Sequence, residues 1–463
     1  MKVAFFDNGN LGLLFCRLAQ RLQERHDMEV YIICLSYKKA QFYEKRFGVK
    51  SLYTNINDHQ RHQSGEEVIR NLEYKFDAFS LNKAIMLDRV LSEWNAVKAA
   101  NFLTSFTYNL KKVIEQEDID IIFGEITWAV EYISYYLMQY LGKHYYNPLN
   151  TSVIPGRLCF LNSYNDNSFI KNIESGNEVN EVVEGFMKDR MQININNQAS
   201  FLKSKLPPNF VKRSKNLLFT YNKEDYRYAL QLKLKILKKY AIRSQINAIK
   251  TSLFVNFKDI KDKYPNKKLA LLALHVQPEA TPDTVAPEFS NQLELARNIS
   301  KNLPSDYLLL IKEHPNGIGS RAVHELLQFR NIPNSILLDP FESTNTFIKN
   351  IDVVFTIAGT ISFEASLYGI HSFVFSDVYY NIFPYVTKVN NVKEIKQELS
   401  NREKLPKDEL YQKNLSAYVK VYNNSFEGDI YDPFLKPKVL EEKNIINLEK
   451  TFVQFIRTIM ERE

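Results

Sequence analysis

The sequence predicts an α/β protein built from two Rossmann-like domains, and three observations carry this expectation. The chain opens with an apolar run over 2–7, a glycine-containing turn and a helical pattern, which is how a Rossmann-like half begins. From residue 269 onward, short apolar runs alternate regularly with helical patterns. A strongly basic stretch separates the two patterns, so we expect a domain boundary inside 206–266.

In the first half, apolar runs predict strands over 2–7, 28–36 and 118–128, with a short strand at 143–147. Helical patterns lie between these runs, as a parallel sheet with covering helices requires. The following stretch, 147–167, contains two prolines and one glycine and is predicted to be a loop.

In the second half, five apolar runs alternate with four helical patterns, which predicts a doubly wound sheet. The expected strands lie at 269–275, 307–315, 335–339, 352–359 and 371–376. The expected helices lie at 288–303, 321–330, 343–350 and 360–369. The segment from 438 onward predicts a terminal helix.

These patterns give four predicted parts of the chain. They are an N-terminal Rossmann-like domain (1–205), a basic helical linker region (206–265), a C-terminal Rossmann-like domain (266–437) and a terminal helix (438–463).

The positive charge of the chain is concentrated in its middle. Residues 201–270 hold 18 Lys and Arg against 4 Asp and Glu, although the net charge of the whole chain is only +7. This segment is either a solvated linker helix or, over 211–250, a surface that attracts an anionic membrane face or a polyanionic acceptor. No nucleic-acid-binding module is recognisable, so we expect no nucleic acid partner.

Composition and cysteine use indicate a cytoplasmic protein. The three cysteines show no metal-ligand spacing, and the eight histidines form no ligand cluster, so we expect no cofactor and metal-independent chemistry. The N-terminus lacks the pattern of a signal peptide, and no window holds some 18 uncharged apolar residues, so no membrane-spanning helix is expected.

The candidate site residues follow from the carboxyl ends of the predicted strands, where open parallel sheets bind their ligands. In "YLLLIKEHPNG", a core strand stops at Lys312, His314 and Pro315. Proline cannot join the strand ladder and holds His314 in an extended conformation. A rim imidazole beside a lysine suits a phosphate oxygen or a ribose hydroxyl, although His314 could equally cap the strand through local hydrogen bonds.

A second rim, "AGTISFE", opens directly into a helix. Gly359 permits a close approach of the backbone, and Thr360 and Ser362 supply hydroxyls. The free N–H groups of a helix start favour an anion. Glu364 either complements the helix dipole or accepts hydrogen bonds from ribose hydroxyls.

The third rim is "HVQPEAT", in which a strand again ends before a proline. Gln277 can both donate and accept hydrogen bonds, as recognition of a base, a sugar or a carboxylate requires, and Pro278 follows it. The alternative is an ordinary turn from strand to loop.

Together, "LALHVQPEAT", "LLIKEHP" and "TIAGTISFEASLYG" resemble the capsular and surface polysaccharide biosynthesis glycosyltransferases. The group includes the capsule Kdo transferases, with similar Gln-Pro and His-Pro motifs. The resemblance covers roughly 266–380 and is looser over 118–160. It implies a GT-B-like fold, in which two Rossmann-like domains face each other across a cleft.

The resemblance also implies roles for the rim residues. The C-terminal domain would bind the nucleotide-sugar donor, with His314, Thr360 and Ser362 at the phosphate and Glu364 near the ribose. The Gln-Pro pair would line the same pocket. The N-terminal domain would bind the acceptor and supply the catalytic carboxylate.

Glycosyl transfer needs a base that deprotonates the acceptor or a nucleophilic carboxylate. Glu125 is the first candidate, because it follows a predicted strand at the carboxyl edge, although it could simply begin the next helix. Asp7, Glu279 and Asp283 are the other candidates.

The expected function is therefore a cytoplasmic glycosyltransferase of bacterial capsule or lipopolysaccharide assembly. It would transfer Kdo or another acidic sugar from a CMP-linked donor to a glycan or lipid-linked acceptor, either free in the cytoplasm or as a peripheral protein on the inner membrane face. Two alternatives stay open: a teichoic-acid-like CDP-polyol phosphotransferase, and a non-catalytic GT-B binding protein.

Overall fold

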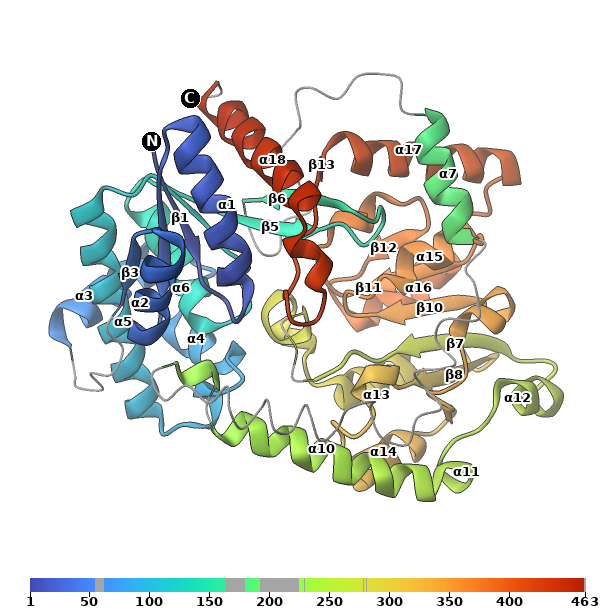
Figure 1. Ribbon diagram of the computed structural model, residues 1–463. Coiled ribbons are helices and arrows are strands. Elements are labelled where there is room, and N and C mark those ends of the chain that lie inside the picture. Colours follow the sequence, from blue (N-terminus) through green and yellow to red (C-terminus); the bar gives the residue numbers. More distant parts are fainter. Residues whose placement is uncertain are drawn as a thin grey trace. The chain divides into compact units, whose positions relative to one another are not determined.

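The computed structural model of the chain, shown in Figure 1, consists of two compact units. It describes residues 1–54, 62–162, 180–191, 225–228, 230–277, 279 and 281–461. The N-terminal unit comprises 1–54, 62–162, 225–228 and 421–461. The C-terminal unit comprises 180–191, 230–277, 279 and 281–420.

In its described part, the N-terminal unit holds a seven-stranded sheet in the order β13-β6-β5-β4-β1-β2-β3. The strands are β1 (Lys2–Phe6), β2 (Glu29–Cys34), β3 (Ser51–Tyr53), β4 (Ile121–Phe123), β5 (His144–Asn150), β6 (Arg157–Leu161) and β13 (Phe426–Glu427). Strands β1 to β5 are parallel, and β6 and β13 extend the sheet in antiparallel fashion. The parallel order 3-2-1-4-5 is that of a Rossmann-like half.

Helices cover this sheet, and the apolar faces of three of them, α1, α2 and α18, build one core cluster with the strands. The helices are α1 (Leu11–His26), α2 (Tyr37–Phe47), α3 (Gln63–Lys75), α4 (Leu81–Leu87), α5 (Ala96–Glu117), α6 (Ala129–Tyr140) and α18 (Glu442–Met460). Phe5 and Phe123 from neighbouring strands both pack against Phe452 of α18, with ring centroids 5.3 Å and 4.9 Å apart.

The predicted helix over 438–463 is confirmed as α18. The prediction that it forms a part of its own is wrong, because α18 belongs to the N-terminal unit. Helix α18 lies beside α1 in the N-terminal unit (Figure 1), and its Glu449 pairs with Arg21 and His26 of α1. The apolar face of α18 completes the core on this side of the sheet, so the domain boundary predicted at 437 falls instead near residue 420.

The predicted loop over 147–167 is also partly wrong. Strand β5 continues to Asn150, and β6 pairs back onto it, with Pro148 opposite Phe160. Phe160 is fully buried among the core aromatic rings. Burial of this side chain stabilises a strand at a position where the nearby proline and glycine indicate a loop.

The C-terminal unit, as far as it is described, contains a six-stranded sheet in the order β12-β11-β10-β7-β8-β9. The strands are β7 (Lys268–Ala273), β8 (Tyr307–Lys312), β9 (Ser335–Leu338), β10 (Val353–Thr356), β11 (His371–Val374) and β12 (Val386–Lys388), and all pairs are parallel. Numbered along the chain, this is the order 3-2-1-4-5-6 of a nucleotide-binding Rossmann sheet. The predicted α/β class with two Rossmann-like sheets, as in a GT-B-like protein, is thus confirmed.

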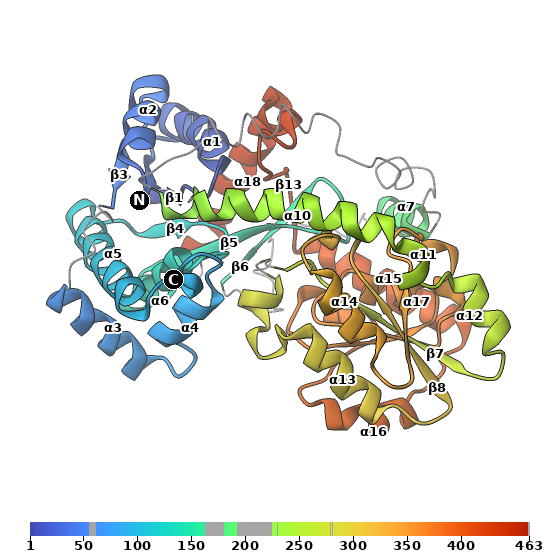
Figure 2. The ribbon, with the colours of Figure 1, turned by 90° about the horizontal axis from the view of Figure 1, so that it is seen from below.

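Both faces of this second sheet are covered. Its helices are α7 (Asn180–Met191), α10 (Leu230–Ala248), α11 (Lys250–Leu253), α12 (Phe257–Lys263), α13 (Gln292–Asn302), α14 (Val323–Arg330), α15 (Ile361–Leu367), α16 (Ile395–Ser400) and α17 (Lys407–Asn423). Helices α13, α14 and α16 contribute to one apolar cluster, and α12 and α15 contribute to the other. Figure 2 shows α13 and α16 together on one side of the strands.

The predicted linker region 206–265 does not form a separate part where it is described: residues 225–228 belong to the N-terminal unit, and 230–265 belong to the C-terminal unit. Leu253 and Phe254 are buried in one core cluster of that unit, and Phe257 and Ile260 are buried in the other. These apolar side chains make α11 and α12 part of the domain. Residues 206–224 and 229 lie outside the described residues.

Along the described ranges, no helix is both long enough and apolar enough to cross a lipid bilayer.

Candidate functional site

The C-terminal unit has a cavity of about 470 Å³ at the carboxyl ends of its strands. It lies at the switch point between β7 and β10, where the strand order of the sheet reverses and where such sheets bind nucleotides. The lining residues are Arg190, Ala273, Leu274, His275, Glu279, Lys312, Glu313, His314, Pro315, Thr344, Asn345, Thr356, Ala358, Gly359, Thr360, Ile361 and Glu364.

The structure brings residues of all three predicted rims to this cavity. The predicted site residues that line it are Glu279, Lys312, His314, Pro315, Gly359, Thr360 and Glu364. Those described but not lining it are Asp7, Glu125, Gln277, Asp283 and Ser362. Pro278 lies outside the described residues.

The His-Pro rim presents a neutral imidazole beside a cation. The backbone N–H of Asn316 donates to Nδ1 of His314 at 3.1 Å, so the proton of the neutral ring is on Nε2, which can donate. Burial, with the positive charges of Lys312 and Lys239, lowers the pKa of His314 and keeps it neutral. Burial also lowers the pKa of Lys312 to about 8, against the opposing effect of Asp339.

A buried ion pair holds this rim from behind. Arg321 donates to Glu313 at 2.5 Å, and Glu313 in turn accepts from the backbone N–H of His314 at 2.9 Å. Arg321 also donates to the backbone oxygen of His275 at 3.1 Å. One guanidinium therefore joins the ends of β8 and β7, which carry two of the three rims.

His275 links its own rim, at the end of β7, to the rim "AGTISFE" at the end of β10. Its Nε2 lies 3.1 Å from Oγ1 of Thr356 and accepts from the backbone N–H of Ala358 at 3.1 Å. Burial, with the positive charges of His314 and Arg321, lowers the pKa of His275 to about 4, so the ring is neutral. The ends of β7 and β10 are thus linked directly under the cavity.

The turn before α15 is tightly packed. The N–H of Gly359 donates to Oγ1 of Thr356 at 3.1 Å, and a Cβ on Gly359 would lie only 2.5 Å from that oxygen. Thr360 lines the cavity as expected. Ser362 does not: it is fully buried, and its hydroxyl donates to the backbone oxygen of Gly359. This geometry does not support the expected phosphate contact of Ser362.

Gln277 and Asp283 hold a turn and do not line the cavity. The amide of Gln277 donates to Asp283 at 3.0 Å and to the backbone oxygen of Ser290 at 2.8 Å, and its oxygen accepts from Gln292. The carboxylate of Asp283 also accepts from the backbone N–H of Glu279. These contacts give both side chains a role in the shape of the rim, and the expected donor contact of Gln277 and catalytic role of Asp283 stay predictions.

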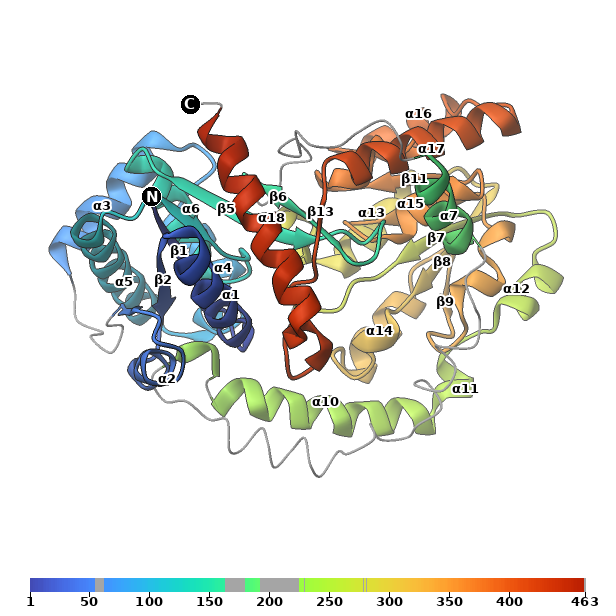
Figure 3. The ribbon, with the colours of Figure 1, turned by 45° about the horizontal axis from the view of Figure 1, so that its top comes forward.

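Glu364 already has a cationic partner in this structure. The guanidinium of Arg190, on α7, donates to its carboxylate and lies over the Phe363 ring at 5.4 Å. Figure 3 shows α7 beside α15. Arg190 lines the cavity, so α7 adds a positive charge to a site that is otherwise built from strand ends.

In the N-terminal unit, Asp7 follows β1 but is fully buried. Its carboxylate accepts from Lys39 at 3.0 Å and from Tyr43 at 3.3 Å, and its backbone oxygen accepts from Arg227 at 2.8 Å. A carboxylate enclosed and paired in this way does not reach a substrate hydroxyl, so its predicted catalytic role is not supported.

Glu125 lies between β4 and α6, at the carboxyl edge, and is half-buried. Burial raises its pKa, and the positive charge of Arg89 opposes part of this shift. A carboxylate at such an edge, with its pKa raised by burial, is a candidate general base.

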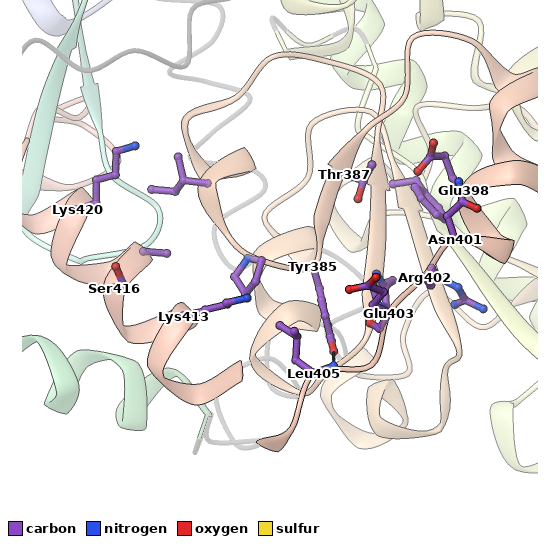
Figure 4. Close-up of a pocket in the computed structure, with 15 residues that line it drawn as sticks. Tyr385, Thr387, Glu398, Asn401, Arg402, Glu403, Leu405, Lys413, Ser416 and Lys420 are labelled. Carbon is purple, nitrogen blue, oxygen red and sulfur yellow. Dashed lines mark hydrogen bonds between the residues drawn. The ribbon is translucent and has the colours of Figure 1, made fainter. Parts of the chain in front are cut away.

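Another cavity of the C-terminal unit, of about 650 Å³, contains none of the predicted site residues. It lies between α17, the end of α16 and the edge strand β12, with Lys413 and Tyr385 on its wall (Figure 4). Its cations are engaged locally: Arg402 donates to Tyr307, and Lys413 pairs with Glu409. Among the described side chains, no group of three or more His, Cys, Asp or Glu is placed to hold a metal ion.

Sequence reasoning missed three residues of this site. His275 ends an apolar strand beside the Gln-Pro pair, so its position after the strand could have identified it. No local pattern marks Arg321 or Arg190, because their partners lie 8 and 174 residues away.

No protein-family model matches the chain. Among curated proteins, Protein FixF of Sinorhizobium fredii is 32% identical over 124 residues, a match that spans 26% of this chain and only 28% of that protein. The Thermosulfurimonas dismutans KpsC beta Kdo 2,7 transferase structure is 14% identical, with 76% of this chain and 89% of that chain covered and a TM-score of 0.34. The UDP-GlcNAc 2-epimerase of Neisseria meningitidis, bound to UDP-GlcNAc, is 15% identical, with 98% and 99% covered and a TM-score of 0.23.

Proposed function

We propose that this protein is a glycosyltransferase of bacterial capsule or lipopolysaccharide assembly, which uses a nucleotide-sugar donor. The donor is a CMP-linked acidic sugar, such as CMP-Kdo, and the acceptor is a glycan or a lipid-linked glycan. The reaction is metal-independent.

One observation carries the proposal. The three motifs that resemble surface polysaccharide glycosyltransferases are spread over more than 80 residues of sequence, yet residues of all three line one cavity at the switch point of a Rossmann sheet. Its volume of about 470 Å³ lies in the usual range of small-molecule sites. Lys312 and the Nε2–H of His314 supply the cation and the hydrogen-bond donor that a phosphate prefers.

The acceptor is activated by Glu125. As a general base it takes the proton of the acceptor hydroxyl, whose oxygen forms the new bond to the anomeric carbon of the donor sugar. The phosphate of the donor leaves with the electron pair of the bond that joined it to this carbon. His314 stabilises the negative charge that develops on this leaving phosphate. Glu279, which lines the donor cavity, is the second carboxylate candidate.

Calorimetry with CMP, CDP, UDP and GDP on the wild type and on His314→Ala tests the proposal. We expect selective binding of CMP, with affinity reduced roughly ten- to a hundredfold in the variant, because one hydrogen bond to an anion is lost. The matched control is His324→Ala, since His324 is exposed on α14 and does not line the cavity.

Each other outcome has a definite meaning. Preference for UDP or GDP contradicts the CMP-linked donor. Preference for CDP with a phosphate-containing product favours the CDP-polyol phosphotransferase. No binding of any of the four nucleotides favours the non-catalytic binding protein.

The proposed acceptor lies at the inner face of the membrane, which the basic stretch 211–250 would attract at about 1 kcal/mol per well-placed cation. Lys238 is exposed on α10 and suits this role, whereas the side chains of Lys233 and Lys235 lie outside the described residues. Lys239 does not suit it, because its Nζ donates to the backbone oxygen of Asn316 at 2.6 Å. Reversing the charges of Lys233, Lys235 and Lys238 should release the protein from anionic vesicles, and unchanged partitioning contradicts the idea.

A further inference from the structure

Arg190 differs from the other cations of the donor cavity in its origin and in its hydrogen bonding. It comes from α7, which precedes the Rossmann sheet of this unit in the chain. Besides Arg190–Glu364, α7 contacts the unit through Tyr411, which donates to Glu184, and Tyr368, which donates to the backbone oxygen of Met191 at 3.0 Å. The helix is therefore held near its middle and at its C-terminal end, and Arg190 lies in the cavity wall.

The guanidinium of Arg190 is only partly satisfied. One Nη donates to Glu364, but Nε is buried and has no acceptor among the described residues. A buried N–H without an acceptor is unfavourable, and most such groups in proteins find a partner. Because Arg190 lines the cavity, a small rotation of its side chain would bring this N–H to an oxygen bound there.

The chemistry of a guanidinium limits what this partner is. Its planar fork matches a phosphate or a carboxylate, and it stays protonated where a buried lysine loses charge. The pKa of Lys312 is lowered to about 8, and His314 is neutral. Among the described lysines and arginines that line the cavity, Arg190 is therefore the one whose charge does not depend on pH.

We propose that Arg190 binds an anionic oxygen of the donor and thereby selects donors that carry this group. Glu364 holds the guanidinium in place, and the unpaired Nε–H takes the anion. The inference rests on the proposed function and adds a specificity-determining residue to it. The oxygen belongs either to the nucleotide phosphate or to the carboxylate of the acidic sugar.

Calorimetry on the wild type, Arg190→Lys and Arg190→Ala, with cytidine, CMP and CMP-N-acetylneuraminate as probes, tests this inference and distinguishes the two sources. If the oxygen is the phosphate's, Arg190→Ala weakens CMP roughly ten- to a hundredfold and leaves cytidine unchanged. If it is the sugar's, CMP binding is unchanged and the CMP-linked acidic sugar alone is weakened. Arg190→Lys, which keeps the charge but not the fork, falls between the wild type and Arg190→Ala.

Two controls separate a ligand contact from the docking of α7. Tyr411→Phe removes a docking contact of α7 without changing the cavity wall, and Lys188→Ala removes an exposed charge of the same helix. Both should keep wild-type affinity for all three probes. The inference is overturned if Arg190→Ala binds all three like the wild type, or if Tyr411→Phe weakens CMP as much as Arg190→Ala does. A wild type that binds none of the probes overturns the proposed function, and the inference with it.

Discussion

Replacing Arg321 by methionine should destabilise the C-terminal unit and distort its donor cavity together. The change leaves the carboxylate of Glu313, with a side chain only 2% exposed, without its cationic partner. It also removes the donor to the backbone oxygen of His275. Breaking a buried ion pair by removing one member costs about 3–5 kcal/mol. For a unit of this size, the midpoint of thermal unfolding should fall by roughly 10 °C.

Thermal unfolding followed by circular dichroism, with CMP calorimetry on the same samples, measures both effects. CMP affinity should fall because Glu313 positions the backbone of His314. The double variant Glu313→Gln with Arg321→Met keeps an acceptor for that N–H but no buried charge, so it should recover much of the lost stability. The matched control is Lys268→Met, which breaks the exposed Lys268–Asp306 pair and should leave the midpoint near the wild-type value. The reasoning is refuted if Arg321→Met lowers the free energy of unfolding by less than about 1 kcal/mol, or if the double variant is no more stable than Arg321→Met.

Three further predictions concern the same sites. Glu125→Gln should lower sugar transfer by roughly a hundred- to ten-thousandfold with CMP affinity unchanged, and transfer at the wild-type rate would exclude Glu125 as the base. The pKa of His275 is lowered from 6.5 to about 4, so its protonation favours the unfolded chain, and its contribution to the free energy of unfolding is complete above pH 6.5 and is lost between pH 6.5 and 4. Denaturant unfolding of His275→Gln across this pH range should lack this loss, and a pH profile identical to that of the wild type contradicts the prediction. Gly359→Ala should lower the free energy of unfolding by about 1–3 kcal/mol, because the new Cβ would lie 2.5 Å from Oγ1 of Thr356. Adding Thr356→Ala should restore part of this stability, and a Gly359→Ala variant as stable as the wild type contradicts the packing argument.

Local patterns were sufficient to identify the strands and rims of the C-terminal unit. Its buried parallel strands are continuous apolar runs, and β8 ends at Lys312, shortly before Pro315, which has no backbone donor for a strand ladder. Because parallel strands end at one edge of the sheet, the residues that follow them meet, which is why His314, Gly359 and Glu364 were found from sequence.

The same patterns could not show which side chains face the ligand and which hold the turn. Gln277, Asp283 and Ser362 have the chemistry of a binding site, but their partners are neighbouring backbone groups and side chains. Asp7 follows a strand as Glu125 does, yet it is enclosed by Lys39 and the segment that carries Arg227.

The sequence by itself determined the two Rossmann-like sheets and the three rims, because periodicity, proline and glycine act on the backbone within a few residues. Tertiary structure alone decided that α18 completes the N-terminal core, that Arg321 joins two rims and that Arg190 enters the donor cavity. Helix α18 and Arg190 contact partners distant in the chain, and the free energy of such contacts comes from burial and charge pairing, which leave no periodic signal in the sequence.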